Sequence, residues 1–394
     1  MSIKIIAIGD PHFKDNNTYE TNIMHSSIIK LLIKYKNNDN IIDVVIEGDI
    51  LDKFEAVKEG TFNRVLKFVE DIMKHCRHVY LIIGNHDRPN NNVFLTDEHF
   101  FNALKKWKNI TVIDKVMIIK IKAENNISED EEIEAEFVFV PYVPVGKFRQ
   151  ALNTVGLDHP LENPNCNTEQ WEKLKTMAGV FSHQEYYGCK IGHLRSSNGD
   201  LWPKDAPFNV SGHIHDEEYL QPNLHYTGTP MQHGHTDTGN KTISLYNYEK
   251  IDNKWQMGKE EKIDLKIPKK IHLKLTKEEL LNFEIPENAT QIKIDIAIDT
   301  VEYLQLVKNP KIKKLLDAKI KIKPIDTRKK LKKNQLGSIV PIKLTYSKRL
   351  NKEICQSDIG VQNEFERIFG PIEKEIEKEE EIKKPKKKNK IIFE

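Results

Sequence analysis

Side chains of the kinds that bind metal ions follow five apolar stretches of this sequence. They are Asp10 and His12 after residues 3–8, Asp49 after 41–46, Asn85 and His86 after 79–83, His183 after 179–181, and His213 and His215 after 208–210. The stretches are rich in β-branched residues and alternate with helically spaced apolar segments at 20–35 and 61–75, which predicts an α/β domain. Ligands bind beyond the carboxyl ends of strands in such sheets, so we expect one shared crevice.

Glycine directly precedes four of these residues, at Gly9-Asp10, Gly48-Asp49, Gly84-Asn85 and Gly212-His213. A residue without a side chain leaves room there for a tight turn or an approaching phosphate. Asp10 and His12, like His213 and His215, are spaced by two, which places both side chains on one face of an extended chain, ~6 to 7 Å apart. Such pairs can flank one metal or reach two metals ~3.5 to 4 Å apart.

Composition narrows the class of protein. Hydrophobic residues make up 38% of the 394 residues and charged residues 30%, as in folded soluble proteins. No apolar run approaches the roughly 20 residues of a membrane helix, and the first residues lack a signal-peptide pattern. The four cysteines form no Cys-x-x-Cys pair. We therefore expect no membrane partner and a cytoplasmic location, or a nuclear one in a eukaryotic host.

The net charge of +2 combines segments of opposite sign. Residues 1–268 contain 31 basic and 39 acidic residues, residues 269–352 contain 21 and 9, and residues 353–394 contain 9 and 11. A basic segment beside an acidic one is typical of a polyanion-binding module joined to a cation-binding module. A solvated, lysine-rich surface is the alternative.

Four regions are predicted along the chain. Residues 1–268 form the catalytic domain, and residues 269–350 form a basic α+β domain with strands at 270–275, 291–298 and 318–322 and helices at 277–282 and 300–309. Residues 351–372 carry a short apolar stripe, Phe365, Ile368 and Phe369, on a helix that could dock on a partner or pack on its own domain. Residues 373–394 alternate blocks of Glu and Lys and are expected to be disordered.

These motifs resemble a known family. The signature of calcineurin-like metallophosphoesterases is matched over about the first 250 residues by Asp10-x-His12, Gly48-Asp49, Gly84-Asn85-His86-Asp87, His183 and Gly212-His213-x-His215. The chain is most similar to the SbcD and meiotic recombination eleven group of DNA repair nucleases, on the motifs Ser211-Gly212-His213-Ile214-His215, His183-Gln184 and Tyr226-x-Gly228-Thr229-Pro230 and on the basic domain that follows. The resemblance implies a β-sandwich flanked by helices, with a small α+β capping domain.

The resemblance also implies roles for individual residues. One metal would be held by Asp10, His12, Asp49 and His215, and the other by Asp49, Asn85, His183 and His213, with Asp49 bridging. Mixed nitrogen and oxygen ligands suit manganese, iron or zinc better than calcium, and manganese is the family's usual activator.

Three further residues are candidates for catalysis. His86 would orient the phosphate or protonate the leaving oxygen. Asp87 would either fix the imidazole of His86 or cap the turn. Asp52 stands where the family carries Asp or His near the site, although a surface-loop aspartate is the alternative. His233 and His235 are assigned to a loop at the rim of the cleft, either touching DNA or uninvolved.

The implied function is a metal-dependent DNA exonuclease and endonuclease in recombination and repair, which hydrolyses phosphodiester bonds with water activated by two metals. A phosphatase or small-molecule phosphodiesterase is the alternative. The group works with an SbcC-type ATPase and commonly as a homodimer. Glu185 replaces the glycine usual after the His-Gln pair, and residues 53–56 replace a proline-containing stretch, so the preference for one DNA strand stays open.

Overall fold

The structure is a computed structural model that describes residues 1–325, except residues 39, 55–56, 125–132, 162, 193, 236, 238–239 and 288. Residues Met1–Ile325 form one compact unit. The end of the basic segment, the predicted docking helix at 351–372 and the charged tail at 373–394 lie outside the described residues.

The first sheet has six strands. Their order is β14 (Lys254–Ile263), β13 (Ile243–Ile251), β1 (Ser2–Ile8), β2 (Ile42–Ile46), β3 (His78–Ile82) and β4 (Ile110–Ile113). Strands β1 to β4 are parallel, whereas β13 is antiparallel to both β1 and β14. Every residue of β2 is buried, as expected for a parallel strand that is covered on both faces.

The second sheet also has six strands. Their order is β11 (Glu218–Gln221), β12 (Leu224–Tyr226), β10 (Asn209–Gly212), β7 (Gly179–His183), β6 (Glu134–Val140) and β5 (Met117–Lys122). The central strands β12, β10, β7 and β6 are parallel, and the edge strands β11 and β5 pair antiparallel. A two-stranded hairpin, β8 (Lys190–Ile191) and β9 (Leu194–Arg195), lies outside both sheets.

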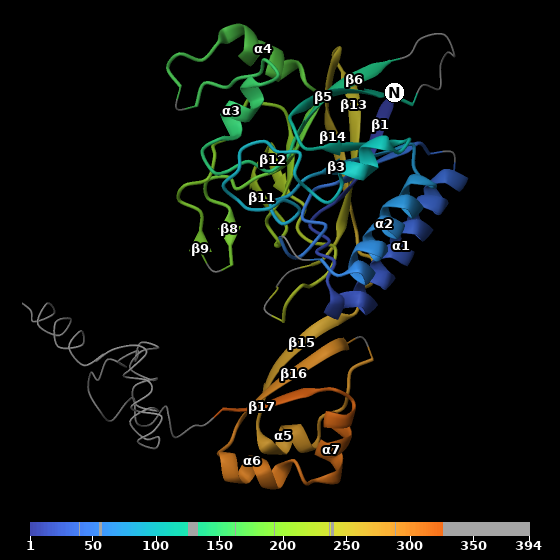
Figure 1. Cartoon of the computed structure of the whole chain (residues 1–394), viewed down its shortest axis with the longest axis vertical. Helices are drawn as coiled ribbons and strands as arrows, with labels where there is room; N and C mark the ends of the chain where they lie inside the picture. The colour runs from blue at the N-terminus through green and yellow to red at the C-terminus, as the bar shows by residue number, and fades with distance from the viewer. Residues whose placement is uncertain are drawn as a thin grey trace, which may run out of the picture. The chain divides into compact units, whose positions relative to one another are not determined.

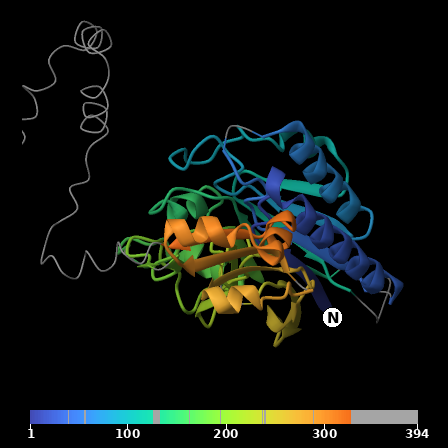
Figure 2. The same cartoon turned by 90° about the horizontal axis from the view of Figure 1, so that it is seen from below.

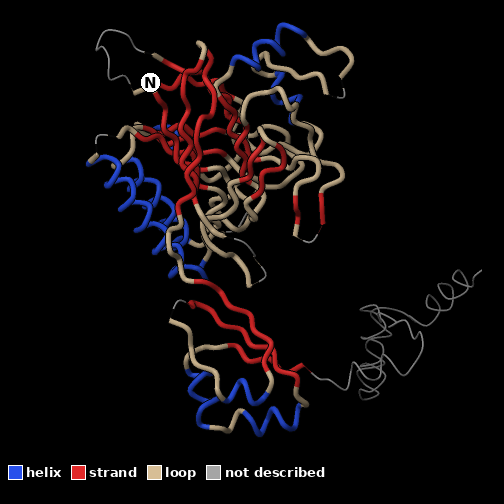
Figure 3. Tube along the Cα trace, turned by 180° about the vertical axis from the view of Figure 1, so that it is seen from behind, coloured by secondary structure: helices blue, strands red, loops and turns tan. Residues whose placement is uncertain are grey.

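The two sheets pack face to face through a shared apolar core. Ile5 and Tyr80 of the first sheet contribute to one buried cluster with Phe137, Phe139 and Phe181 of the second. Helices cover the outer faces, with α1 (Thr18–Asn37) and α2 (Glu59–Met73) over the first sheet and α3 (Phe148–Asn153) and α4 (Thr168–Thr176) over the second (Figures 1, 2 and 3). The predicted α/β fold, a β-sandwich flanked by helices, is confirmed.

Two short 3-10 helices, η1 (Asp15–Asn17) and η2 (Asn102–Lys106), join the strands of the first sheet to its helices and loops. Among the described residues, no helix is long and apolar enough to cross a membrane.

Residues 269–325 form a separate parallel sheet of β15 (Lys269–Leu275), β16 (Ala289–Ala297) and β17 (Lys321–Ile325). It packs with α5 (Lys277–Leu281), α6 (Thr300–Leu306) and α7 (Pro310–Asp317) around its own apolar cluster (Figure 1). Helix α7 was not predicted, although Asn309 caps it and Pro310 is its first residue, both ordinary signals of a helix start. Strand β17 begins three residues later than the predicted segment.

Candidate metal centre

The predicted ligands converge from the ends of five strands, but those strands belong to two sheets. Strands β1, β2 and β3 of the first sheet lead to Asp10, His12, Asp49 and Asn85, and β7 and β10 of the second lead to His183, His213 and His215. A single open sheet would have sufficed for the predicted crevice. Here the facing of two sheets closes the site, and all of these residues except His213 and His215 are at most 4% exposed.

The backbone is strained at this site. Asp10, His12, Asp49 and His213 all have positive φ, at 30°, 44°, 46° and 83°. An L-residue in this region costs roughly 1 to 3 kcal/mol, and such residues cluster where function requires a fixed geometry. The surrounding contacts must therefore hold each turn in place.

Glycines next to the ligands allow the turns to approach one another. A Cβ on Gly84 would lie 2.2 Å from the backbone nitrogen of Asp49 and 2.3 Å from its Oδ1. A Cβ on Gly48, whose φ is +96°, would lie 2.5 Å from Nδ1 of His183. Any side chain at either position would push the Asp49 carboxylate or the His183 ring out of the site.

One group of donor atoms surrounds the ring of His183. Its Nδ1 donates to the Glu47 carbonyl at 2.6 Å, and its Nε2 lies 3.0 Å from Oδ1 of Asn85 and 3.4 Å from Oδ1 of Asp49. Nδ1 of His213 lies 3.0 Å from the same Asn85 oxygen. In neutral His183 the Nε2 lone pair would face the lone pairs of two oxygens, so a proton or a metal cation is required between them. The donor set fits a divalent metal.

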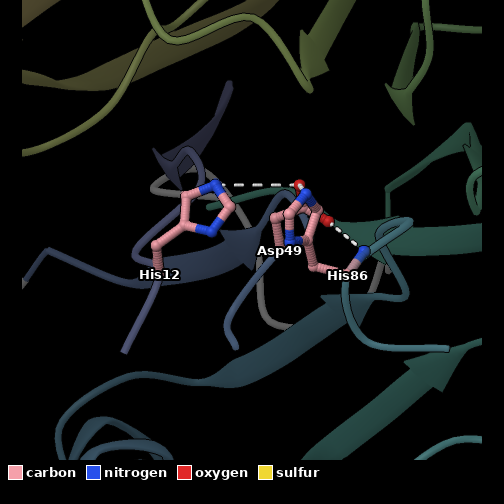
Figure 4. A group of neighbouring side chains, drawn as sticks. All are labelled: His12, Asp49 and His86. Carbon is pink, nitrogen blue, oxygen red and sulfur yellow. Dashed lines mark hydrogen bonds and ion pairs between the residues drawn. The ribbon is translucent and has the colours of Figure 1, made fainter. Parts of the chain in front are cut away.

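A second group lies on the other side of Asp49. Figure 4 shows His12 and His86 next to this carboxylate, with Nε2 of His12 3.7 Å and Nε2 of His86 3.9 Å from Oδ2. Candidate ligand atoms of these three residues lie within 4.8 Å of one another, as do those of Asp49, His183 and His213. Nε2 of His215 lies 3.1 Å from Nε2 of His12. Asp49 belongs to both groups, which is the position of a bridging ligand.

Asp10 lies next to the donor atoms, but its carboxylate is oriented by the backbone. Both of its oxygens accept from the N–H of His213, at 2.9 and 3.1 Å, and one lies 3.4 Å from Nδ1 of His183. The assignment of Asp10 to one metal with His12, Asp49 and His215 stays a prediction, as does the assignment of Asn85, His183 and His213 to the other.

The electrostatics of the site favour a bound cation. Burial raises the pKa of Asp10 to about 7. Burial opposes protonation of His183, but the carboxylates of Asp49 and Asp10 raise its pKa to about 9. Burial lowers the pKa of His213 to about 3. Without a metal, a proton therefore occupies His183 near neutral pH and Asp10 is partly protonated, and a metal that binds there must displace these protons.

His86, Asp52 and Asp87 lie in the turns that follow β2 and β3, and hydrogen bonds join these two turns. The side chain of His86 is 29% exposed, and its Nδ1 donates to the backbone carbonyl of Asp52 at 2.9 Å. The Asp52 carboxylate contacts Nζ of Lys14 at 2.8 Å and lies 3.8 Å from Nδ1 of His12. Asp87 accepts from the backbone N–H of Leu51 and of Gly84, each at 3.0 Å. Of the two roles considered for Asp87, this geometry corresponds to bracing the turn.

Two further side chains lie at the site: Phe54, for which the sequence predicts no role, and His233, which is predicted at the rim of the cleft. The ring of Phe54 stacks on His86 with centroids 4.8 Å apart. The ring of His233 lies 4.7 Å from that of His12 and 5.2 Å from that of His215. His233 and His235 are two residues apart in the sequence, which does not distinguish them. Their packing does, because the ring of His235 lies 6.3 Å from that of His272 and not beside the predicted ligands.

The chain matches a protein family and two viral proteins in sequence. The family model described as calcineurin-like phosphoesterase matches residues 3–217, which include every strand end from Asp10 to His215. "Putative phosphoesterase 078R" of Invertebrate iridescent virus 3 is 34% identical over 268 residues, covering 68% of this chain and 67% of that protein. "Putative phosphoesterase 244L" of Invertebrate iridescent virus 6 is 33% identical over 311 residues, covering 78% and 98%.

Among solved structures, a 5'-nucleotidase precursor from Thermus thermophilus matches with a TM-score of 0.34 and 11% identity, over 67% of this chain and 54% of that one. A similarity this low carries no argument about function.

Proposed function

The chain belongs to the calcineurin-like phosphoesterase family, and from this premise we propose that it is a metal-dependent DNA nuclease of the SbcD and meiotic recombination eleven group. Its activity as a metal-dependent phosphoesterase follows from the family. The DNA substrate is the proposed part, and the observation that carries it is the basic segment 269–352, with 21 basic and 9 acidic residues. Within it, the described residues 269–325 hold 12 basic and 8 acidic residues.

The proposed centre holds two divalent cations, with manganese favoured and iron or zinc as alternatives. Asp10, His12, Asp49, Asn85, His183, His213 and His215 would bind them. Once bound, they would supply Lewis-acid stabilisation of the phosphate charge and an activated water.

His86 is the side chain best placed to act on the substrate. Because the Asp52 carbonyl can only accept, Nδ1 of His86 keeps its hydrogen, and Nε2 is left to contact substrate. Neutral His86 can accept a hydrogen bond at Nε2, whereas the imidazolium can donate a proton from it to a leaving oxygen. The stacked ring of Phe54 and the Asp52 carbonyl restrict its orientation.

A cavity of about 560 Å³ beside Asp52 also supports an extended anionic substrate. It is lined by Phe13, Lys14, Asp15, Asn16, Asp52, Lys53, Val57, Lys58, Thr61 and Phe100. Lys14 pairs with Asp52 and Lys58 pairs with Asp15, so exposed Lys53 leaves the lining with an excess positive charge. A DNA strand that continues past the scissile phosphate would place its next phosphate near this charge and a base against the partly exposed Phe100.

The test uses the full-length protein with manganese and linear duplex or single-stranded DNA. We expect degradation that is lost in Asp49→Ala and reduced by at least 10²-fold in His86→Ala, while the exposed control Asp205→Ala stays active. Binding should weaken steeply with salt, because lysine and arginine contacts to phosphates release counterions. If the protein leaves all DNA intact but hydrolyses bis(p-nitrophenyl) phosphate, the nuclease proposal fails and the phosphatase or small-molecule phosphodiesterase replaces it.

We also propose that the protein acts as a homodimer with an SbcC-type ATPase. The support is the similarity of the strand-end motifs to that group and the apolar stripe Phe365, Ile368 and Phe369 in the sequence.

A further inference from the structure

We propose that His233 is a positioning residue for the metal-binding turn from Asp10 to His12, and that Lys270 of β15 holds it in place. The inference rests on the two-metal centre of the proposed function, but it does not depend on DNA being the substrate.

His233 contacts the turn through a hydrogen bond and through its ring. Its Nε2 donates to the backbone carbonyl of Asp10 at 2.9 Å. Its ring packs edge to face on His12, at an interplanar angle of 79°, and on His215, at 67°. The remaining ring nitrogen, Nδ1, is buried and has no hydrogen-bond partner among the residues that the structure describes. An unpartnered buried nitrogen costs free energy, so the other contacts of this ring must offset that cost.

The turn needs such a support because both predicted ligands in it have left-handed backbone conformations, with φ of 30° at Asp10 and 44° at His12. Among the described residues, three hydrogen bonds hold its backbone, in addition to those that the Asp10 carboxylate accepts from His213. The N–H of His12 donates to the Asp49 carbonyl at 3.0 Å, Nδ2 of Asn17 donates to the His12 carbonyl at 2.8 Å, and His233 donates to the Asp10 carbonyl. Of these donors, His233 is the one that comes from the region after β12 and also touches two predicted ligands.

The loop of His233 is hydrogen-bonded to β15, the first strand of the small domain that β15 to β17 form with α5, α6 and α7. Nζ of Lys270 donates to the His233 carbonyl at 3.2 Å, and the backbone N–H of Lys270 donates to Oε1 of Gln232 at 2.7 Å. Lys270 is only 7% exposed, and its Nζ lies 3.8 Å from Oε1 of Glu20 in α1. A buried lysine beside a carboxylate holds its position more firmly than an exposed one. The first strand of the small domain is therefore two hydrogen-bonded steps from the metal-binding turn.

The consequence is an effect on metal affinity. Residues that orient metal ligands without binding the metal typically change affinity by about 10- to 100-fold when they are removed. Loss of His233 should therefore weaken the metal held by Asp10, His12 and His215 more than the metal held by Asn85, His183 and His213.

The experiment measures Mn²⁺ binding to the full-length protein by isothermal titration and by the EPR signal of free Mn²⁺. We expect two sites in the wild type. In His233→Phe, which keeps a ring but cannot donate to Asp10, one site should weaken about 10- to 100-fold. In His233→Gln, whose amide can donate to that carbonyl, part of the affinity should return. The matched control His235→Gln should bind Mn²⁺ like the wild type.

A second pair of variants tests the attachment to β15. Lys270→Met should weaken the same site by a smaller factor, whereas Lys274→Met, an exposed lysine of the same strand, should not. If the wild type binds neither Mn²⁺ nor Fe²⁺ nor Zn²⁺, the proposed metal centre itself is wrong. If it binds two and both His233→Phe and Lys270→Met bind them equally tightly, the positioning role is wrong. Equal loss at both sites, with a lowered Tm of the metal-free protein, would indicate a merely structural role and would also overturn it.

Discussion

At the scale of single residues, the site concentrates groups that are costly to bury. Glu47 follows β2 in the sequence and is fully buried. Its backbone carbonyl orients the ring of His183. Thr227 donates to one of its carboxylate oxygens, and within the described part of the chain the other oxygen has no hydrogen-bond partner. Burial raises the pKa of Glu47 to about 8. The protein therefore folds more readily when this carboxyl is protonated than when it is ionised.

We therefore expect Glu47→Gln to raise the free energy of unfolding relative to the wild type by an amount that grows with pH. The folded-state pKa lies above the usual 4.5, so the wild type loses stability as pH rises from 4.5 to 8, by up to about 1.4 kcal/mol for each pH unit. Glutamine is neutral throughout and does not contribute this loss. Urea unfolding measures the free energy of unfolding of the two metal-free proteins at pH 5 and pH 8. The value for the variant minus that for the wild type should be larger at pH 8 than at pH 5. A stability difference that is the same at both pH values would refute the assignment.

At the scale of elements, the chain between α3 and α4 is organised around one carboxylate. Asp158, only 3% exposed, accepts from Nε of Arg149 in α3 at 2.6 Å and from the backbone N–H of His159 and of Asn167 at 2.9 and 3.3 Å. Asn167 in turn caps α4. Burial opposes ionisation of Asp158, but Arg149 and the backbone donors lower its pKa well below the usual range.

We therefore expect Asp158→Asn to lower the free energy of unfolding by about 2 kcal/mol at pH 7, because charged hydrogen bonds are lost. A depressed carboxyl pKa contributes stability that is present above pH 4 and is lost as pH falls through the folded-state pKa. The difference between variant and wild type should shrink in unfolding measurements near pH 3. Exposed Asp205→Asn is the control, and an equal loss in it would contradict the role of Asp158.

At the scale of the whole molecule, the chain passes from β14 of the phosphoesterase sandwich into β15 of a small parallel sheet, and Lys270 adds hydrogen bonds between the two parts. Residues 326–352 contain the other 9 basic residues of the basic segment and its one remaining acidic residue, and the apolar stripe follows them in the sequence. The boundary predicted near residue 268 stays a prediction, since Met1–Ile325 is one compact unit.

The proposed partner can be tested directly. A chain that ends at Lys352 keeps the metal centre and the basic segment but lacks the apolar stripe. We expect it to hydrolyse a small phosphodiester at the wild-type rate and to lose co-purification with an SbcC-type ATPase. A full-length Phe365→Ala and Phe369→Ala double variant should behave likewise. Retention of the ATPase by both proteins would exclude docking through this segment.

The local pattern of the sequence was sufficient for the five strands that lead to the predicted ligands and for the phosphoesterase family. The period of a strand and the turn after it depend on neighbouring residues, so Gly9-Asp10 and Gly212-His213 could be placed at strand ends from their spacing alone. The start of α7 is likewise determined by neighbouring residues, since Asn309 caps the helix and Pro310 is its first residue.

Tertiary structure decided what those residues touch. That two facing sheets form the centre, that Asp52 rather than Asp87 holds the imidazole of His86, and that His233 but not His235 supports the ligands all depend on contacts between distant segments. Asp10 and His233 are 223 residues apart, and no local preference relates them. Only the packing of the two sheets and of β15 brings them within a hydrogen bond.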